Sequence, residues 1–228
     1  MTILITAGPT REAIDPVRYL TNRSSGKMGY ALADVAAAKG NRVILISGPT
    51  DAALEVPDGV DFIPVESAAD MYVAVERWMA KADVAIFAAA VADYRPVEFV
   101  EQKIKTVGDE LTLQLVRNAD ILGSARGKFL FEGTLVGFAA ETENVVENAR
   151  GKLLKKGCDM VVANDVSRKD IGFDSDENEV ILVFRDEEET VAKADKHGIA
   201  HSVVEVAMGM EEDRQRGVSD GANTNTHV

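Results

Sequence analysis

The chain has 228 residues, of which 46% are hydrophobic and 28% charged, and its 25 basic and 38 acidic side chains give a formal net charge of −13. Such a composition is that of a globular protein, and it excludes wholesale disorder, a collagen-like repeat and a disulfide scaffold. The negative charge disfavours nucleic-acid backbones and anionic membranes, so we expect neither as a partner.

The cysteine count and the hydropathy indicate a cytoplasmic protein. Cys158 is the only cysteine, so no intrachain disulfide can form, as is usual in a reducing compartment. No apolar run reaches the ~18 residues that a membrane-spanning helix needs, and no signal-peptide pattern is found. We therefore expect a cytoplasmic protein without a membrane anchor.

The first predicted elements are a strand over residues 2–6 and a helix over residues 26–39, joined by a polar loop. The strand is a short β-branched run that ends in a Gly-Pro turn. Apolar residues recur at helical spacing in the helix, Ser24 or Ser25 can cap its start, and Gly40 follows its end.

The same alternation of strand and helix continues along the chain. Further strands are predicted over residues 42–47, 60–65, 82–90, 134–140 and 160–163, and further helices over 67–81 and 144–156. Such alternation requires crossover connections, which favour a mainly parallel sheet covered on both faces. We therefore predict a doubly wound, Rossmann-like α/β fold with helices on both faces.

Three segments depart from this pattern. Residues 95–110 are charged and irregular, and we interpret them as a mobile flap that leads into a strand-like run over 111–116. Residues 180–184 are expected to be antiparallel, because the loop before them is too short for a helical crossover. Residues 211–228 are polar and are predicted to form a disordered tail after a single domain over 1–210.

The loop after the first strand matches neither of two common phosphate-binding motifs. A dinucleotide fingerprint needs G-x-G-x-x-G, but the loop opens with Gly8-Pro9-Thr10. A P-loop fails as well, because Thr21 stands where its first glycine belongs and Met28 replaces the magnesium-binding Ser/Thr. What remains is a polar loop before a helix N-terminus, which favours an anion or a carbonyl. Simple capping explains Ser24 or Ser25 but leaves Asn22 without a role.

Candidates for acid-base, nucleophilic or metal chemistry are weak. The three histidines all lie at or beyond position 197, away from every predicted strand end, so a Ser-His-Asp triad is disfavoured. Cys158 is best interpreted as a buried structural thiol. The acidic cluster over residues 170–189 lacks ligand spacing, and no metal ligands are assigned.

Basic residues give a stronger indication of a functional site than the histidines, the cysteine or the acidic cluster do. Lys103 and Lys105 alternate in the flap, while Lys152 and Lys156 are four residues apart on one predicted helix face. Such a pair either faces solvent, which composition alone favours, or meets the phosphates of a ligand. Asp93 follows a buried strand at the edge where α/β sheets bind ligands, although a turn role explains it equally well.

Six motifs together carry a family resemblance. The segments TAGPTREAIDPVRYLTNRSSGKMGYALA, AAAVADYRP, QKIK, VRNADIL, VGFAAET and ANDVS occur in this order. In sequence and separation they resemble phosphopantothenate-cysteine ligase (phosphopantothenoylcysteine synthetase) of the bacterial, CTP-using type, from the first strand to about residue 184.

The resemblance implies a two-step ligation in coenzyme A biosynthesis, with CTP and Mg²⁺. The carboxylate of 4'-phosphopantothenate attacks the α-phosphate of CTP and releases pyrophosphate, and L-cysteine then displaces CMP from the acyl-cytidylate. Such an enzyme mainly positions its reactants and neutralises charge. Two alternatives stay open: the same ligation driven by ATP, and a Rossmann-like nucleotide-binding module without catalysis.

The motif match also implies site residues. Asn22 and Lys103 are expected to be catalytic, and Arg18, Asn22 and Ala90 to bind the substrate. The nucleotide is expected to contact Phe87, Ala88, Ala89, Asp93, Lys103, Val116, Arg117, Asn118, Ala119, Phe138, Lys152 and Lys156. Family analogy further suggests a homodimer.

Two departures from the family pattern affect the expected site. The flap reads Lys103-Ile104-Lys105-Thr106 where the common form has KIKK, so a third basic contact is absent. The NPD turn is Asn118-Ala119-Asp120, which removes a rigid proline. The flavin-dependent decarboxylase domain that often precedes such ligases is not found in the sequence, so we expect no flavin.

Overall fold

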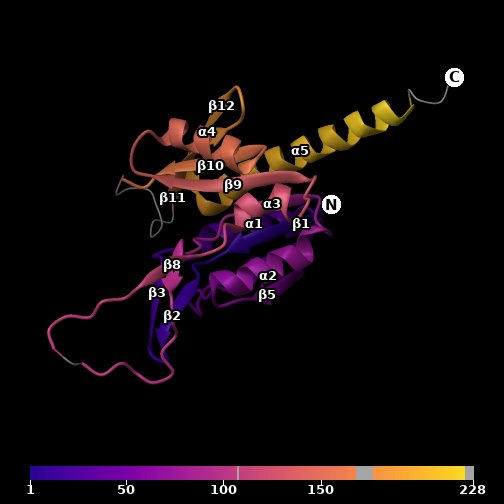
Figure 1. Cartoon of the computed structure of the whole chain (residues 1–228). Coiled ribbons are helices and arrows are strands. Elements are labelled where there is room, and N and C mark those ends of the chain that lie inside the picture. Colours follow the sequence, from indigo (N-terminus) through magenta and orange to yellow (C-terminus); the bar gives the residue numbers. More distant parts are fainter. Residues whose placement is uncertain (107, 168–176, 224–228) are drawn as a thin grey trace.

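The computed structural model describes residues 1–106, 108–167 and 177–223, and its centre is an eight-stranded sheet (Figure 1). The strands of the sheet are, in chain order, β1 (Thr2–Ala7), β4 (Arg42–Ser47), β5 (Val60–Pro64), β6 (Val84–Phe87), β9 (Thr134–Glu141), β10 (Met160–Asp165), β11 (Glu177–Val183) and β12 (Glu188–Asp195). Across the sheet they follow the order β12-β11-β10-β9-β6-β1-β4-β5. The six strands from β5 to β10 are parallel, whereas β11 and β12 are antiparallel. The predicted doubly wound sheet and its antiparallel strand are thus confirmed.

Five helices among the described residues cover the two faces of this sheet. They are α1 (Lys27–Ala38), α2 (Ala68–Met79), α3 (Ile121–Gly127), α4 (Val145–Lys156) and α5 (Lys196–Asn223). Because side chains alternate along a strand, Ile3 and Ile5 of β1 pack with α1 and α5, while Leu4 packs with α2, α3 and α4 on the other face. Over the part of the chain that the structure describes, no helix is long and apolar enough to cross a bilayer.

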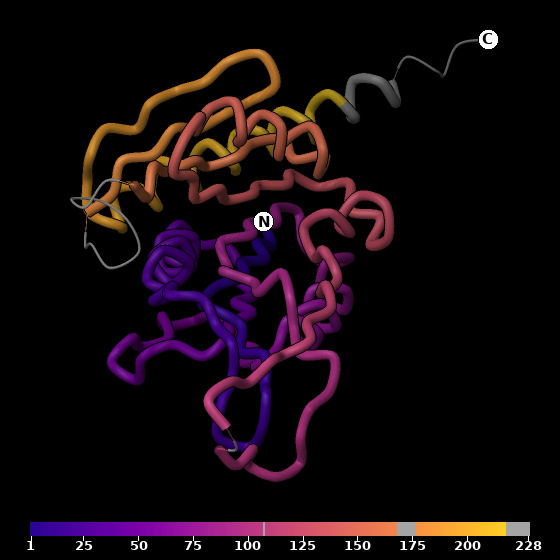
Figure 2. Tube along the Cα trace, turned by 60° about the vertical axis from the view of Figure 1, so that its left-hand side comes forward, coloured from indigo at the N-terminus to yellow at the C-terminus, as the bar shows by residue number. Residues whose placement is uncertain are grey.

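An arm projects from one end of the sheet, where the sequence predicted loops and a single strand-like run over residues 111–116 (Figures 1 and 2). Its first part is the antiparallel hairpin of β2 (Arg11–Asp15) and β3 (Arg18–Thr21). Its second part is the pair β7 (Tyr94–Pro96) and β8 (Leu115–Arg117), together with the long connection between them. In the structure the flap that the sequence placed over residues 95–110 corresponds to this connection, and from here on the name refers to residues 97–114. The strand expected over 111–116 is therefore shorter and lies later in the chain.

The start of α1 also differs from the sequence expectation. Gly26 is the N-cap residue, with φ of 81°, and no side chain caps the helix. The predicted capping by Ser24 or Ser25 is therefore wrong, although Ser24 Oγ accepts a 3.3 Å hydrogen bond from the Gly26 N–H. A Cβ at position 26 would lie 2.5 Å from Thr50 Cγ2, so a side chain larger than that of glycine does not fit.

Helix α5 extends to Asn223, whereas the sequence predicted a disordered tail over residues 211–228, of which 224–228 lie outside the described residues. Glu211 explains the extension, because its side chain is buried against β9. Its carboxylate accepts hydrogen bonds from the backbone N–H of Thr134 (3.0 Å) and from the Thr134 hydroxyl (2.9 Å), and it also contacts Arg214 and Gln215. A polar composition thus concealed a tertiary contact.

Replacing Glu211 with alanine should lower the free energy of unfolding by about 1–3 kcal/mol, because Thr134 keeps two buried donors without an acceptor. Burial raises the pKa of Glu211, but the hydrogen bonds from Arg214, Thr134 and Gln215 outweigh it and leave the pKa lowered. The contribution of ionised Glu211 to the free energy of unfolding should therefore be present at neutral pH and be lost as the pH falls through that lowered pKa. Urea unfolding measures the change, and the exposed Glu212→Ala is the control. Equal stability of the two variants would contradict the contact.

Candidate functional site

The largest pocket described lies at the carboxyl edge of the sheet and has a volume of about 340 Å³. Thr6 of β1, Phe87 of β6 and Phe138 of β9 line it, together with the loop after β6, residues 117–122 and three lysines of α4. The strand order turns at β1, which has β4 on one side and β6 on the other. Ligands of open α/β sheets bind in the crevice at such a turning point.

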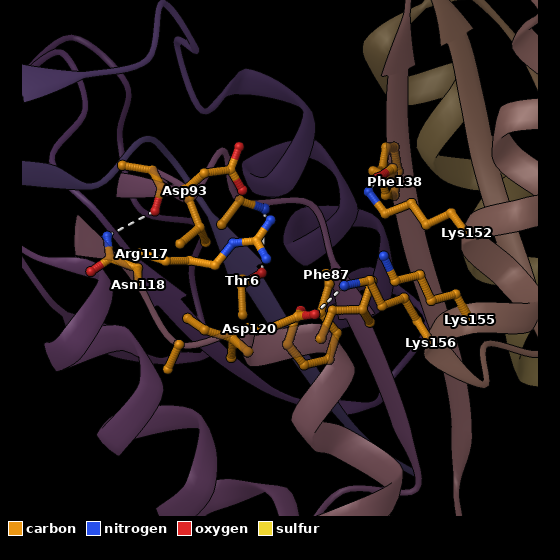
Figure 3. Close-up of a pocket in the computed structure, with 16 residues that line it drawn as sticks. Thr6, Phe87, Asp93, Arg117, Asn118, Asp120, Phe138, Lys152, Lys155 and Lys156 are labelled. Atoms are coloured by element: carbon orange, nitrogen blue, oxygen red, sulfur yellow. Dashed lines mark hydrogen bonds and ion pairs between the residues drawn. The ribbon is translucent and has the colours of Figure 1, made fainter. Parts of the chain in front are cut away.

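Most of the residues expected to contact a nucleotide line this one pocket, from four separate segments of the chain. They are Phe87, Ala89, Asp93, Arg117, Asn118, Ala119, Phe138, Lys152 and Lys156. Figure 3 shows the α4 lysines on one side of the pocket and Asp93, Arg117 and Asn118 on the other. Ala88, Lys103 and Val116 do not line it. Nucleotide binding by the set stays a prediction.

The lysines of α4 make one wall of the pocket cationic. The ammonium group of Lys152 donates to the backbone oxygen of Phe138, and burial lowers its pKa. Lys156 forms an ion pair with Asp120, which also caps α3 by accepting a 2.9 Å bond from the Gly123 N–H. Burial raises the pKa of Asp120, but the bonds from Lys156 and Gly123 outweigh it and the pKa is lowered. The i, i+4 spacing identified the lysine pair, whereas its partner Asp120 could be found only from the tertiary structure.

The segment opposite the lysines is held by a hydrogen-bond network around Asn118. Its backbone N–H donates to Asp93 O and its side-chain amide to Ala92 O, both at 2.8 Å. Arg95 donates at 3.0 Å to both the Asn118 side-chain oxygen and Arg117 O. The side chain and backbone N–H of Asn118 and the backbone oxygen of Arg117 are therefore all occupied in fixing this loop. Sequence reasoning missed Arg95, whose two hydrogen bonds help to fix this loop.

A second pocket, of about 50 Å³, lies against the N-terminus of α1. Ala88 and Phe138 line it together with residues 24–29, and Asn178 and Lys196 supply buried polar side chains. Phe138 lines both pockets, so the two adjoin. The backbone N–H groups at a helix start favour an anion. An extended anionic ligand could therefore pass over the sheet edge from one pocket to the other.

Asn22 and Ala90, two residues expected at the substrate, are in contact. The Asn22 amide donates a 2.9 Å hydrogen bond to Ala90 O, and Asn22 lines an open pocket of about 300 Å³ beside β3. Arg18 does not join them, because its guanidinium is bound to Asp15 and to the backbone oxygen of Ile104 in the flap. None of the three described pockets is lined by Arg18.

Lys103 and Cys158 lie in opposite environments, since Lys103 is exposed and Cys158 is buried. Lys103 lies exposed on the flap, outside the described pockets, and its side chain makes no hydrogen bond or ion pair with the described residues. Cys158 is buried, as expected, and burial raises the pKa of its thiol to about 12. A thiol of that pKa is a poor nucleophile at neutral pH.

A mostly parallel, Rossmann-like sheet with a cationic pocket at its turning point defines the class of doubly wound α/β domains. Comparison with known families narrows this class. Residues 1–210 match the model of the DNA/pantothenate metabolism flavoprotein C-terminal domain. The chain belongs to this family, and the resemblance seen in the sequence motifs is thereby confirmed.

Individual relatives agree with the assignment to the family. The chain is 48% identical over 205 residues to the coenzyme A biosynthesis bifunctional protein CoaBC of Vibrio parahaemolyticus, covering 89% of this chain and 51% of that protein. It is 51% identical over 185 residues to the Bacillus subtilis protein of the same name, covering 81% and 45%. The crystal structure of a CoaBC C-terminal domain superposes with a TM-score of 0.77 at 44% identity, covering 93% of this chain and 96% of that one. The chain thus spans about half the length of these curated relatives.

Proposed function

We propose that this domain is a phosphopantothenate-cysteine ligase of coenzyme A biosynthesis that uses CTP. The cationic pocket beside the Asn118 loop carries the proposal, because one cavity brings together the α4 lysines, which suit phosphates, and the loop of residues 117–119 opposite them. Relatives named for coenzyme A biosynthesis, at 48% and 51% identity, support the choice of pathway. The products would be 4'-phosphopantothenoylcysteine, CMP and pyrophosphate.

The residues of the pocket suit a reaction that needs positioning more than proton transfer. In the first step the phosphopantothenate carboxylate attacks the α-phosphate of CTP, and Lys152 and Lys156 would neutralise charge on the phosphates. In the second step the cysteine amine attacks the acyl carbon of the acyl-cytidylate and CMP leaves. Asn22, bound to Ala90 O at 2.9 Å, would orient the acyl group for that attack.

Magnesium would enter with the nucleotide. Mg²⁺ is commonly held by substrate phosphates with one or two carboxylates, and Asp93 offers a carboxylate in the pocket. Within residues 1–106, 108–167 and 177–223, no group of three or more His, Cys, Asp or Glu side chains could hold a metal by itself. We assign no flavin to this domain and place its activity in the cytoplasm.

The arm would form the contact of a homodimer. It exposes large apolar side chains from the hairpin, from β7 and β8 and from the flap, among them Val17 (58% exposed), Tyr19, Tyr94 and Phe99. Several large apolar side chains exposed on one projecting arm favour an interaction surface there. Equilibrium sedimentation should therefore give twice the chain mass of 24.5 kDa, and a monomer at micromolar concentration would contradict the dimer.

Turnover with CTP should exceed turnover with ATP by at least about 100-fold in kcat/KM, because a site that hydrogen-bonds one base leaves its polar groups unpaired with another. Product formation from phosphopantothenate, cysteine and Mg²⁺ is measured with each nucleotide in parallel. Equal or better use of ATP would favour the ATP-driven version of the same ligation. Tight nucleotide binding without product would instead favour a non-catalytic module.

A further inference from the structure

Asp15, at the end of β2, is a fully buried carboxylate surrounded by hydrogen-bond donors. Its side chain has no exposed surface. Oδ1 accepts from the backbone N–H groups of Val17 and Arg18, both at 2.9 Å. Oδ2 accepts from Nε and Nη2 of Arg18, at 3.0 and 2.5 Å, and from the backbone N–H of Ile104, at 3.1 Å. The last contact reaches across 89 residues into the flap.

Ile104 is bound through both of its backbone polar groups. While its N–H donates to Asp15, its carbonyl oxygen accepts a 3.1 Å bond from Arg18 Nη2. The two side chains of the hairpin thus pair with Ile104 as a neighbouring strand would pair with it. Earlier in the flap, the N–H of Val100 donates to Ile14 O at 3.1 Å. Figure 2 shows the hairpin and the flap side by side along the arm.

We propose that Asp15 and Arg18 form a latch that holds the flap at Ile104 and so sets where Lys103 can reach. Ile104 is partly buried, whereas Lys103 and Lys105 on either side of it are exposed. Because Ile104 is already anchored, the flap has less conformational entropy left to lose when Lys103 binds a ligand. Asp15 and Arg18 are thus positioning residues, while the substrate contact expected for Arg18 stays a prediction.

The chemistry of the pair suits a permanent latch. A guanidinium group presents several donors in one plane, so Nη2 can serve Asp15 and Ile104 together. The hydrogen bonds from Arg18 and from three backbone N–H groups hold the pKa of Asp15 well below its usual range, although burial opposes them. The carboxylate therefore stays charged at physiological pH, and a charged acceptor makes the stronger hydrogen bonds.

The latch itself can be tested without any activity, by amide hydrogen exchange at Ile104 in the free protein. In Asp15→Asn, the amide oxygen can still accept from the backbone N–H groups of Val17 and Arg18. The NH₂ group, however, then faces the Ile104 N–H and cannot accept its hydrogen bond. Exchange at Ile104 should become about 10- to 100-fold faster, as expected for a lost bond to a charged acceptor. Unchanged exchange at Ile104 would overturn the latch.

The control is Glu12→Gln, since Glu12 is a buried carboxylate of the same hairpin that accepts from Ala68 N–H and does not touch the flap. It should leave Ile104 exchange at the wild-type rate, and equal acceleration in both variants would overturn the latch. Arg18→Lys provides a second test in case Asp15→Asn does not fold. One ammonium group cannot replace the planar fork, so exchange should rise several-fold.

The positioning role rests on the proposed function and is tested by a double-mutant cycle with Lys103→Gln. Asp15→Asn alone should slow pyrophosphate release, whereas in the Lys103→Gln background it should change the rate by less than about threefold. Full additivity of the two losses would show that Asp15 does not act through Lys103. If the wild-type protein releases no pyrophosphate, the proposed function fails, while the exchange result still decides on the latch.

Discussion

Lys103→Gln is expected to slow pyrophosphate release from CTP and phosphopantothenate about 100- to 1,000-fold, even when cysteine is absent. This is the cost, about 2.7–4 kcal/mol, of removing one charge-assisted contact that is made mainly in the transition state. Because the Lys103 ammonium has no ion-pair partner among the described residues, no protein carboxylate would have to be displaced before it meets the triphosphate. Quenched-flow measurement of pyrophosphate reports this first step directly.

Lys39→Gln is the matched control for that experiment. Lys39 is exposed at the end of α1, so the variant changes the net charge equally without touching a pocket. It should release pyrophosphate at the wild-type rate. Normal accumulation of the acyl-cytidylate in Lys103→Gln would contradict the role given to Lys103, and an equal loss in both variants would mean that only long-range charge is at work.

The sheet could be predicted from the sequence because its signals are local. The runs over residues 42–47 and 82–90 are mostly apolar, and they contain the buried strands β4 and β6. Ser67 illustrates the same point for helices: its side chain accepts from Asp70 N–H in a capping box at the start of α2. Each of these signals lies within a few residues of the structure that it specifies.

The arm and the end of α5 could not be predicted, because their stabilising contacts join distant residues. Strand β3 is short and mostly exposed, so it carries no apolar alternation, and the hairpin contacts the flap through Asp15 and Ile104. Glu211 looks like an ordinary surface acid until Thr134, 77 residues earlier, is placed beside it. Charged partners that are brought together only by the fold leave no periodic signal.

The residues of the candidate site likewise include some that local sequence patterns could predict and others that only the tertiary structure reveals. The lysines of α4 and the residues at the strand ends were identified from spacing, from position and from the family resemblance, and the structure places most of them in one pocket. The residues that orient them were missed: Asp120 pairs with Lys156, and Arg95 fixes the loop of Asn118. Arg18 was assigned to the substrate, but the structure binds it to Asp15 and Ile104. Partners of this kind depend on tertiary geometry.

Asn22→Asp should leave the first step largely intact and slow the second about 100-fold, so that acyl-cytidylate accumulates after cysteine is added. The Asn22 amide donates a 2.9 Å bond to Ala90 O, which orients its side chain beside the end of β6. An aspartate would lose that donor and set a carboxylate against the carbonyl oxygen, which misplaces the group that holds the acyl carbon for attack. Rapid quench followed by mass spectrometry of the bound species measures the intermediate.

Asn41→Asp is the control for this change, because the Asn41 amide likewise donates to a backbone oxygen, that of Ala36 at 3.1 Å, but at the far end of α1. It loses an equivalent hydrogen bond and gains the same charge, yet it should turn over normally. If Asn22→Asp formed no acyl-cytidylate at all, Asn22 would belong to the first step. If it turned over normally, the contact with Ala90 would be merely structural, and the second step would have to be guided by another group in the open pocket beside β3.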